Sequence, residues 1–219
     1  MLRLLFEKKG NAIWISHLDL MRLFQRTFKR AGLTLKHTQG FNPRPSVSIA
    51  LPLSVGVSSN CELLEFELDD QVIPCEEIKD RLNANLVEGI TVLNVYENGR
   101  KYRDLAFLEC IVSLEYDSAI SEDACNKIKN LFSQNTLVLP KKTKNGIQDQ
   151  DIIPMIKELS VEAVGEKVIL ITARICCQNP TLNPNQLILA IQTFLPELVP
   201  AFSKCQRIEI FDHQNNIFR

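Results

Sequence analysis

Two short stretches near the amino terminus hold many of the side chains that could do chemistry: residues 16–26, S-H-L-D-L-M-R-L-F-Q-R, and residues 37–45, H-T-Q-G-F-N-P-R-P. In a helix, Asp19, Arg22 and Arg26 share one face, because their spacings are three and four residues. Such a face presents a carboxylate beside two guanidinium groups, which keep Asp19 ionised and together can hold an anion.

The second stretch combines hydrogen-bond donors with an aromatic ring. Gln39, Asn42 and Arg44 can all donate, and Gly40 and two prolines favour a stiff turn. Phe41 could stack on a nucleobase while the planar guanidinium binds a phosphate, a pairing used on single strands. The alternative is that Phe41 plugs the core beneath the loop.

A second hypothesis is that the same two stretches carry out acid–base catalysis. The candidates are His17, Asp19 and His37, and two of them would have to reach the same substrate atom. The structural alternatives are that His17 interacts only with its own backbone and that Asp19 caps the helix.

Charge is segregated along the chain. No acidic residue occurs from Leu20 to Cys61, and the other 177 residues hold 19 bases against all 26 acids. The six bases of this acid-free window are Arg22, Arg26, Lys29, Arg30, Lys36 and Arg44. A second basic segment holds Lys141, Lys142 and Lys144. Clustered cations gain binding free energy by displacing the counterions of a phosphate-bearing partner, so we expect RNA binding. A solvated basic face that binds nothing is the alternative for both segments.

The elements that must position these residues follow from periodicity. The first half predicts a strand over 2–8, a helix from Ser16 to Gly32, strands over 47–53 and 64–68, a helix from Pro74 and a strand over 90–96. The order is βαββαβ, the ferredoxin-like split unit. A polar stretch over 97–103 predicts a linker.

The second half predicts the same order with an elaborated middle. Strands are expected over 105–116, 136–139, 167–175 and 207–211, helices over 121–132 and from 183, and a polar loop over 141–150. The sequence therefore predicts an α+β protein of two tandem ferredoxin-like units with antiparallel sheets, over residues 1–97 and 104–219.

Composition narrows the class of protein. With 45% hydrophobic residues the chain can bury a core, and the lack of a long apolar run or signal peptide predicts a cytoplasmic protein with no membrane contact. Seven cysteines without C-x-x-C spacing predict reduced thiols and no metal site. Nucleotide-binding glycine loops, zinc-protease motifs and hydrolase elbows are also missing from the sequence.

Residues 15–33, I-S-H-L-D-L-M-R-L-F-Q-R-T-F-K-R-A-G-L, and 39–57, Q-G-F-N-P-R-P-S-V-S-I-A-L-P-L-S-V-G-V, resemble an uncharacterised family of domains. Its members are fused to, or encoded beside, cobalamin-binding radical-SAM proteins. Residues 141–152, K-K-T-K-N-G-I-Q-D-Q-D-I, are similar to a weaker signature of that family. The resemblance implies a radical-SAM partner that carries an iron–sulfur cluster, S-adenosylmethionine and cobalamin, with no cofactor in this chain. The family usually has N-P-H-P where this chain has Arg44, which stays protonated and is a poor base.

We therefore expect an accessory protein that binds RNA, such as tRNA or rRNA, or presents a substrate to the radical-SAM enzyme, and that is not catalytic on its own. The alternatives are an RNA-modifying or RNA-cleaving enzyme that uses Asp19 or the two histidines in a cleft between the units, and an adaptor whose basic face docks on an acidic protein. The expected nucleic-acid contacts are Arg22, Arg26, Lys29, Arg30, Lys36, Gln39, Phe41, Asn42, Arg44, Lys141, Lys142 and Lys144.

Overall fold

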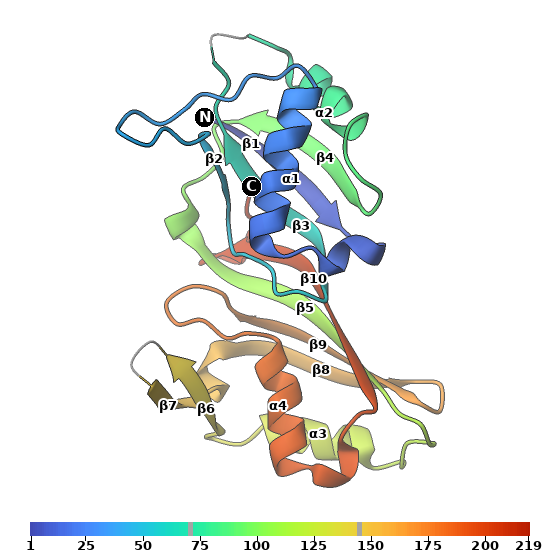
Figure 1. Ribbon diagram of the computed structural model, residues 1–219. Helices are drawn as coiled ribbons and strands as arrows, with labels where there is room; N and C mark the ends of the chain where they lie inside the picture. The colour runs from blue at the N-terminus through green and yellow to red at the C-terminus, as the bar shows by residue number, and fades with distance from the viewer. Residues whose placement is uncertain (70–71, 144–145) are drawn as a thin grey trace. The chain divides into compact units, whose positions relative to one another are not determined.

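The computed structural model describes residues 1–69, 72–143 and 146–219, and the chain divides into two compact units (Figure 1). Unit 1 comprises residues 1–104 with Arg219, and unit 2 comprises residues 105–218. Both units combine antiparallel strands with helices, which confirms the α+β class.

Unit 1 contains a four-stranded antiparallel sheet in the order β4-β1-β3-β2. Its elements are β1 (Leu2–Lys8), η1 (Gly10–Trp14), α1 (His17–Arg30), β2 (Val47–Ile49), β3 (Val57–Phe66), α2 (Cys75–Asn83), β4 (Ile90–Glu97) and η2 (Tyr102–Asp104). The expected strand over 47–53 is shorter than predicted, because Leu51 takes a positive φ of 46° and the chain leaves the sheet.

The apolar stripe of α1 packs on the sheet and fixes which face of the helix is exposed. Phe24 meets Phe6 edge-on with ring centroids 4.9 Å apart, and Phe28 meets Phe66 at 4.8 Å. Aromatic pairs of this kind add about 0.5–1.5 kcal/mol beyond the area that they bury. Because these contacts hold the rotation of α1, its basic residues face solvent.

The segment predicted as a linker lies against unit 1. Buried Arg3 donates from Nη2 to Glu65 Oε1 and to the Arg100 carbonyl, each at 2.5 Å, and its guanidinium lies 4.5 Å from the centre of the Tyr102 ring. Burial, the largest single influence, tends to lower the pKa of Arg3, but the hydrogen bond to Glu65 and the charge interactions with Tyr102, Tyr96 and Glu65 together raise it. The hydrogen bond to the Arg100 carbonyl and the contact with the Tyr102 ring thus hold the segment to the sheet.

Unit 2 contains an antiparallel sheet in the order β10-β5-β9-β8 and a separate hairpin of β6 and β7. Its elements are β5 (Leu105–Glu115), α3 (Ala124–Phe132), β6 (Val138–Thr143), β7 (Gly146–Asp151), η3 (Ile153–Met155), β8 (Ile156–Val164), β9 (Val168–Cys176), α4 (Asn185–Phe194), η4 (Pro196–Leu198) and β10 (Phe202–Asp212). The prediction of a loop over 141–150 is wrong, because the hairpin of β6 and β7 occupies most of these residues. The described residues of β7 are polar or exposed, so the strand lacks the apolar alternation that reveals a strand in sequence.

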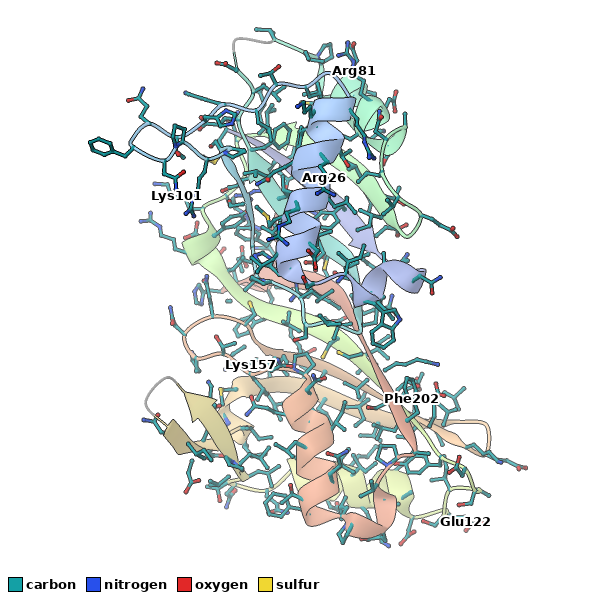
Figure 2. All side chains as sticks on the ribbon, in the orientation of Figure 1. Arg26, Arg81, Lys101, Glu122, Lys157 and Phe202 are labelled. Atoms are coloured by element: carbon teal, nitrogen blue, oxygen red, sulfur yellow. The ribbon has the colours of Figure 1, made fainter. Side chains whose placement is uncertain are left out.

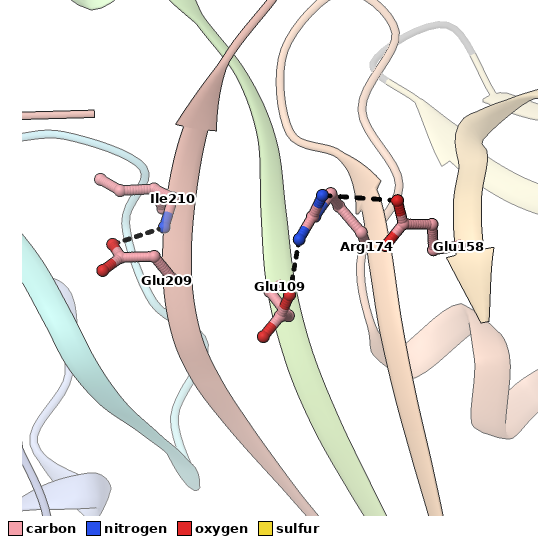
Figure 3. Close-up of polar contacts among 5 residues, drawn as sticks. All are labelled: Glu109, Glu158, Arg174, Glu209 and Ile210. Carbon is pink, nitrogen blue, oxygen red and sulfur yellow. Dashed lines mark hydrogen bonds and ion pairs between the residues drawn. The ribbon is translucent and has the colours of Figure 1, made fainter. Parts of the chain in front are cut away.

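Arg174 links three strands of the unit 2 sheet (Figure 3). From β9 it donates to Glu109 of β5 at 3.0 Å and to Glu158 of β8 at 3.5 Å, and its guanidinium lies 4.3 Å from the centre of the Phe211 ring. Nearby in the same view, Glu209 accepts a hydrogen bond from the Ile210 backbone N–H. Cross-strand pairs of this type favour the observed register.

Candidate functional site

The first turn of α1 holds Asp19 in a fixed network. The Ser16 hydroxyl accepts from the Asp19 backbone N–H at 3.2 Å and donates to Asp19 Oδ2 at 2.7 Å, while Arg22 Nη1 donates to Oδ1 at 3.0 Å. The hydrogen bonds from Ser16 and then Arg22 lower the pKa of Asp19. Asp19 is therefore an ionised carboxylate that accepts from Arg22 and from the hydroxyl of Ser16, the residue that caps the helix.

An arginine groove runs along one flank of α1; we use this name for the hollow of about 500 Å³ beside Arg22, Arg26 and Arg30. The three arginines follow one another at four-residue spacing, so about 6 Å of helix axis separates each from the next. The opposite wall is formed by Asn85 and Val87 of the connection between α2 and β4. Figure 2 shows Arg26 projecting from α1.

Most bases of the acid-free window remain available to an anion. Among the described residues, Arg22 pairs with Asp19 and Lys36 pairs with Glu67 at 3.4 Å. Within the same part of the chain, the remaining four bases make no ion pair and are exposed; they are Arg26, Lys29, Arg30 and Arg44. The two ion pairs are themselves largely exposed, and pairs of that kind contribute little and are screened by salt.

The loop between α1 and β2 is a paired stem that carries an exposed tip. The Ser46 N–H donates to the Lys36 carbonyl at 2.7 Å, the Thr38 N–H donates to the Arg44 carbonyl at 2.8 Å, and the Arg44 N–H donates to Thr38 Oγ1 at 3.0 Å. The loop projects from the rest of unit 1 (Figure 1).

Phe41 lies at this tip and is fully exposed, with a relative exposure of 112%. The alternative that it plugs the core beneath the loop is wrong, because Leu33 and Leu35 fill the core there, at 1% and 6% exposure. Gln39 and Asn42 are exposed beside it.

The two histidines lie at opposite ends of α1. His17 is its first residue, whereas His37 lines a different hollow beside Gly32 and Leu33, after the helix has ended. Fifteen residues at 1.5 Å each place Gly32 about 22 Å along the axis from His17. His17 is not among the residues that line the hollow of His37.

The second basic segment belongs to unit 2. Lys141 lies in β6 and donates to the Thr181 carbonyl at 3.3 Å. The backbone of Lys142 continues the same strand, and Lys144 lies outside the described residues.

Sequence reasoning missed the far wall of the arginine groove. Asn85 and Val87 are more than 50 residues from Arg30 in the chain, and neither carries a functional signature. Asn85 and Val87 reach α1 only because α2 packs beside α1 on the sheet that contains β4.

The fold and the arginine groove together define an α+β protein with a basic helix face. The chain belongs to the family of uncharacterized proteins conserved in bacteria, DUF2344, which it matches over residues 1–184. No curated protein matches it.

Two solved structures are similar to the chain. A chain of a Cbf5-Nop10-Gar1 complex matches with a TM-score of 0.51 and 11% identity, over 95% of this chain and 48% of that chain. This protein thus spans about half the length of that neighbour, and the likeness shows the fold alone. An unknown protein from Galdieria sulphuraria matches with a TM-score of 0.27 and 10% identity, over 94% of this chain and 96% of that one, which is too weak to carry an argument.

No helix in the described part of the chain is long and apolar enough to cross a membrane. Nor does that part bring together three or more His, Cys, Asp or Glu side chains that could hold a metal ion.

Proposed function

We propose that this protein binds RNA through the arginine groove and presents it to a partner enzyme. The observation that carries the proposal is the row of three exposed arginines on one fixed helix face, two of which have no ion-pair partner among the described residues. An RNA strand carries regularly spaced phosphates, so it can bind several of these guanidinium groups at once and release several counterions.

The projecting loop favours RNA over a simple anion. Its stem holds Arg44 and its tip exposes Phe41, so a phosphate and a base can be bound from the same loop. Stacking of bases on exposed aromatic rings is how many proteins bind single strands. Bases in single-stranded loops and ends of tRNA or rRNA are accessible to such contacts.

We also propose that each unit is ferredoxin-like. The order β1-α1-β2-β3-α2-β4 in unit 1 and the order β5-α3-β8-β9-α4-β10 in unit 2 both fit the split βαββαβ unit, with β6 and β7 as an insertion. The domains would then be residues 1–97 and 104–219, with the intervening segment fastened to unit 1.

The proposed partner is a radical-SAM enzyme that supplies the iron–sulfur cluster, S-adenosylmethionine and cobalamin. This part rests on the sequence resemblance of residues 15–33 and 39–57. Catalysis would then belong to the partner, which agrees with the capping role of Asp19 and the separation of His17 from His37. Gel filtration of the two purified proteins with RNA tests the partnership, and separate elution would oppose it.

Charge reversal in the groove tests RNA binding. Arg26→Glu with Arg30→Glu should weaken the binding of labelled tRNA or rRNA fragments about 10- to 100-fold, because two phosphate contacts are replaced by repulsion. Both side chains are exposed, so the variant should stay folded by circular dichroism.

The matched control is Lys129→Glu with Lys157→Glu, an equal change in net charge at exposed positions of unit 2. It should leave the affinity within about twofold of the unaltered protein. Absence of RNA binding at low salt would contradict the proposal and favour the adaptor hypothesis, in which the groove docks on an acidic protein. RNA turnover by the purified chain alone would instead favour the enzyme hypothesis.

A further inference from the structure

A second hollow of about 440 Å³ lies in unit 1, on the other flank of α1 from the arginine groove. The C-terminal half of α1 forms one wall, and the stem of the projecting loop, where His37 bridges to Pro45, forms the other. Its floor is apolar and consists of Phe28, Leu33 and Leu35, none more than 6% exposed. Phe28 and Leu33 are almost wholly covered, so the hollow offers a ligand Leu35 and the half-buried Pro45 as its apolar surface.

The rim of this hollow carries hydrogen-bonding groups that the fold does not use. Gln25, Thr34 and His37 line it, and among the described residues their side chains make no hydrogen bond to protein. An amide, a hydroxyl and an imidazole provide both donors and acceptors. An apolar floor with a few polar groups at the edge suits a planar heterocycle, whose faces are apolar and whose edge is polar.

Lys29 connects this hollow with the arginine groove. It lines the hollow together with Gln25, and on the exposed side of α1 it lies three residues from Arg26 of the groove. Residues three apart are neighbours on a helix surface, so Lys29 and Arg26 form a positive ridge between the two hollows. A strand whose phosphates follow this ridge would carry its next base over the second hollow.

We infer that this hollow receives one unstacked nucleobase of the RNA strand bound at the arginine groove. The inference rests on the proposed function and adds a base-binding subsite to it: Gln25, Thr34 and His37 contact the base edge, and Leu35 and Pro45 lie against its face. Lys29 binds the phosphate beside that base.

Comparison of an RNA 12-mer with an abasic ribose-phosphate 12-mer of equal charge tests the inference. The unaltered protein should bind the RNA at least about tenfold more tightly, because Phe41 and the hollow each contact a base that the abasic strand lacks. Gln25→Ala with His37→Ala should lower the affinity for RNA toward that for the abasic strand, with the remaining difference due to the base stacked on Phe41, and should leave the abasic affinity unchanged. Arg26→Glu with Arg30→Glu should weaken both strands.

The matched control is Gln192→Ala with His213→Ala, the same residue types at exposed positions of unit 2, which should change neither affinity. Equal binding of the two strands by the unaltered protein, or equal weakening of both by the Gln25 and His37 variant, would overturn the base subsite and leave the groove intact. If neither strand binds, the proposed function and the subsite are both wrong.

Discussion

Asp19 illustrates how much a local spacing can determine. Its separation of three residues from Ser16 and from Arg22 predicted both a capping role and a guanidinium neighbour, and the structure contains both contacts. The same spacing could not distinguish a catalyst from a cap. The structure adds that each of the two carboxylate oxygens accepts a hydrogen bond, one from Ser16 and one from Arg22, and a catalytic role for Asp19 stays a prediction.

Asp19→Asn should lower the free energy of unfolding at pH 7 by removing an ionised acceptor. Because the folded pKa lies below the ordinary value of an aspartate side chain, this contribution is complete above that ordinary value and is lost as the pH falls through the folded pKa. The difference from the unaltered protein in urea denaturation should therefore shrink below about pH 4.

Asp117→Asn is the control, since Asp117 is exposed and its side chain makes no hydrogen bond or ion pair within the described residues. A difference for Asp19→Asn that is the same at pH 7 and pH 3 would contradict the capping account.

At the scale of elements, the groove depends on how the α2–β4 connection meets η1. Gly89 has φ +86°, its carbonyl accepts from the Lys9 N–H at 2.8 Å, and an added Cβ would meet the Lys9 carbonyl oxygen and Ala12. Val87, a groove wall, lies two residues before it. Only glycine allows this approach, so the position of the wall depends on it.

Gly89→Ala should destabilise the protein by about 1–3 kcal/mol more than Gly165→Ala, because a close contact is added to the strain of a positive φ. Gly165 has φ +69° with nothing within 4 Å of an added Cβ, so it isolates the conformational cost. Urea denaturation measures both differences, and equal destabilisation would show that the contact at Gly89 is unimportant.

The spacing of apolar residues predicted the helices and strands that pack on a core. It did not predict segments that bury few apolar side chains. The first strand, α1 and β4 fall close to their expected ranges because each buries an alternating or helical apolar stripe. Of the hairpin, only the start of β6 was predicted, by the strand over 136–139; the rest was missed because most of the paired residues that follow Pro140 are polar. Likewise, the lining of the second hollow is drawn from a helix, a turn and a loop stem, which no single spacing could connect.

For the whole molecule, net charge conceals the functional surface. The formal charge is −1, yet unit 1 holds a groove with three arginines, the paired Asp19 being the one acid in its lining. Local charge of this kind controls association with nucleic acid, whereas net charge mainly affects solubility. The dependence of binding on salt is therefore the property closest to the proposed mechanism.

The most direct test is the dependence of RNA affinity on salt concentration, for the unaltered protein and for Arg26→Glu with Arg30→Glu. The account predicts that log K falls linearly with log salt for the unaltered protein, and that the slope becomes less steep by about 1.4 in the variant, roughly 0.7 for each lost phosphate contact. An affinity that does not change with salt, or identical slopes for the two proteins, would contradict the claim that the arginine groove binds the RNA backbone.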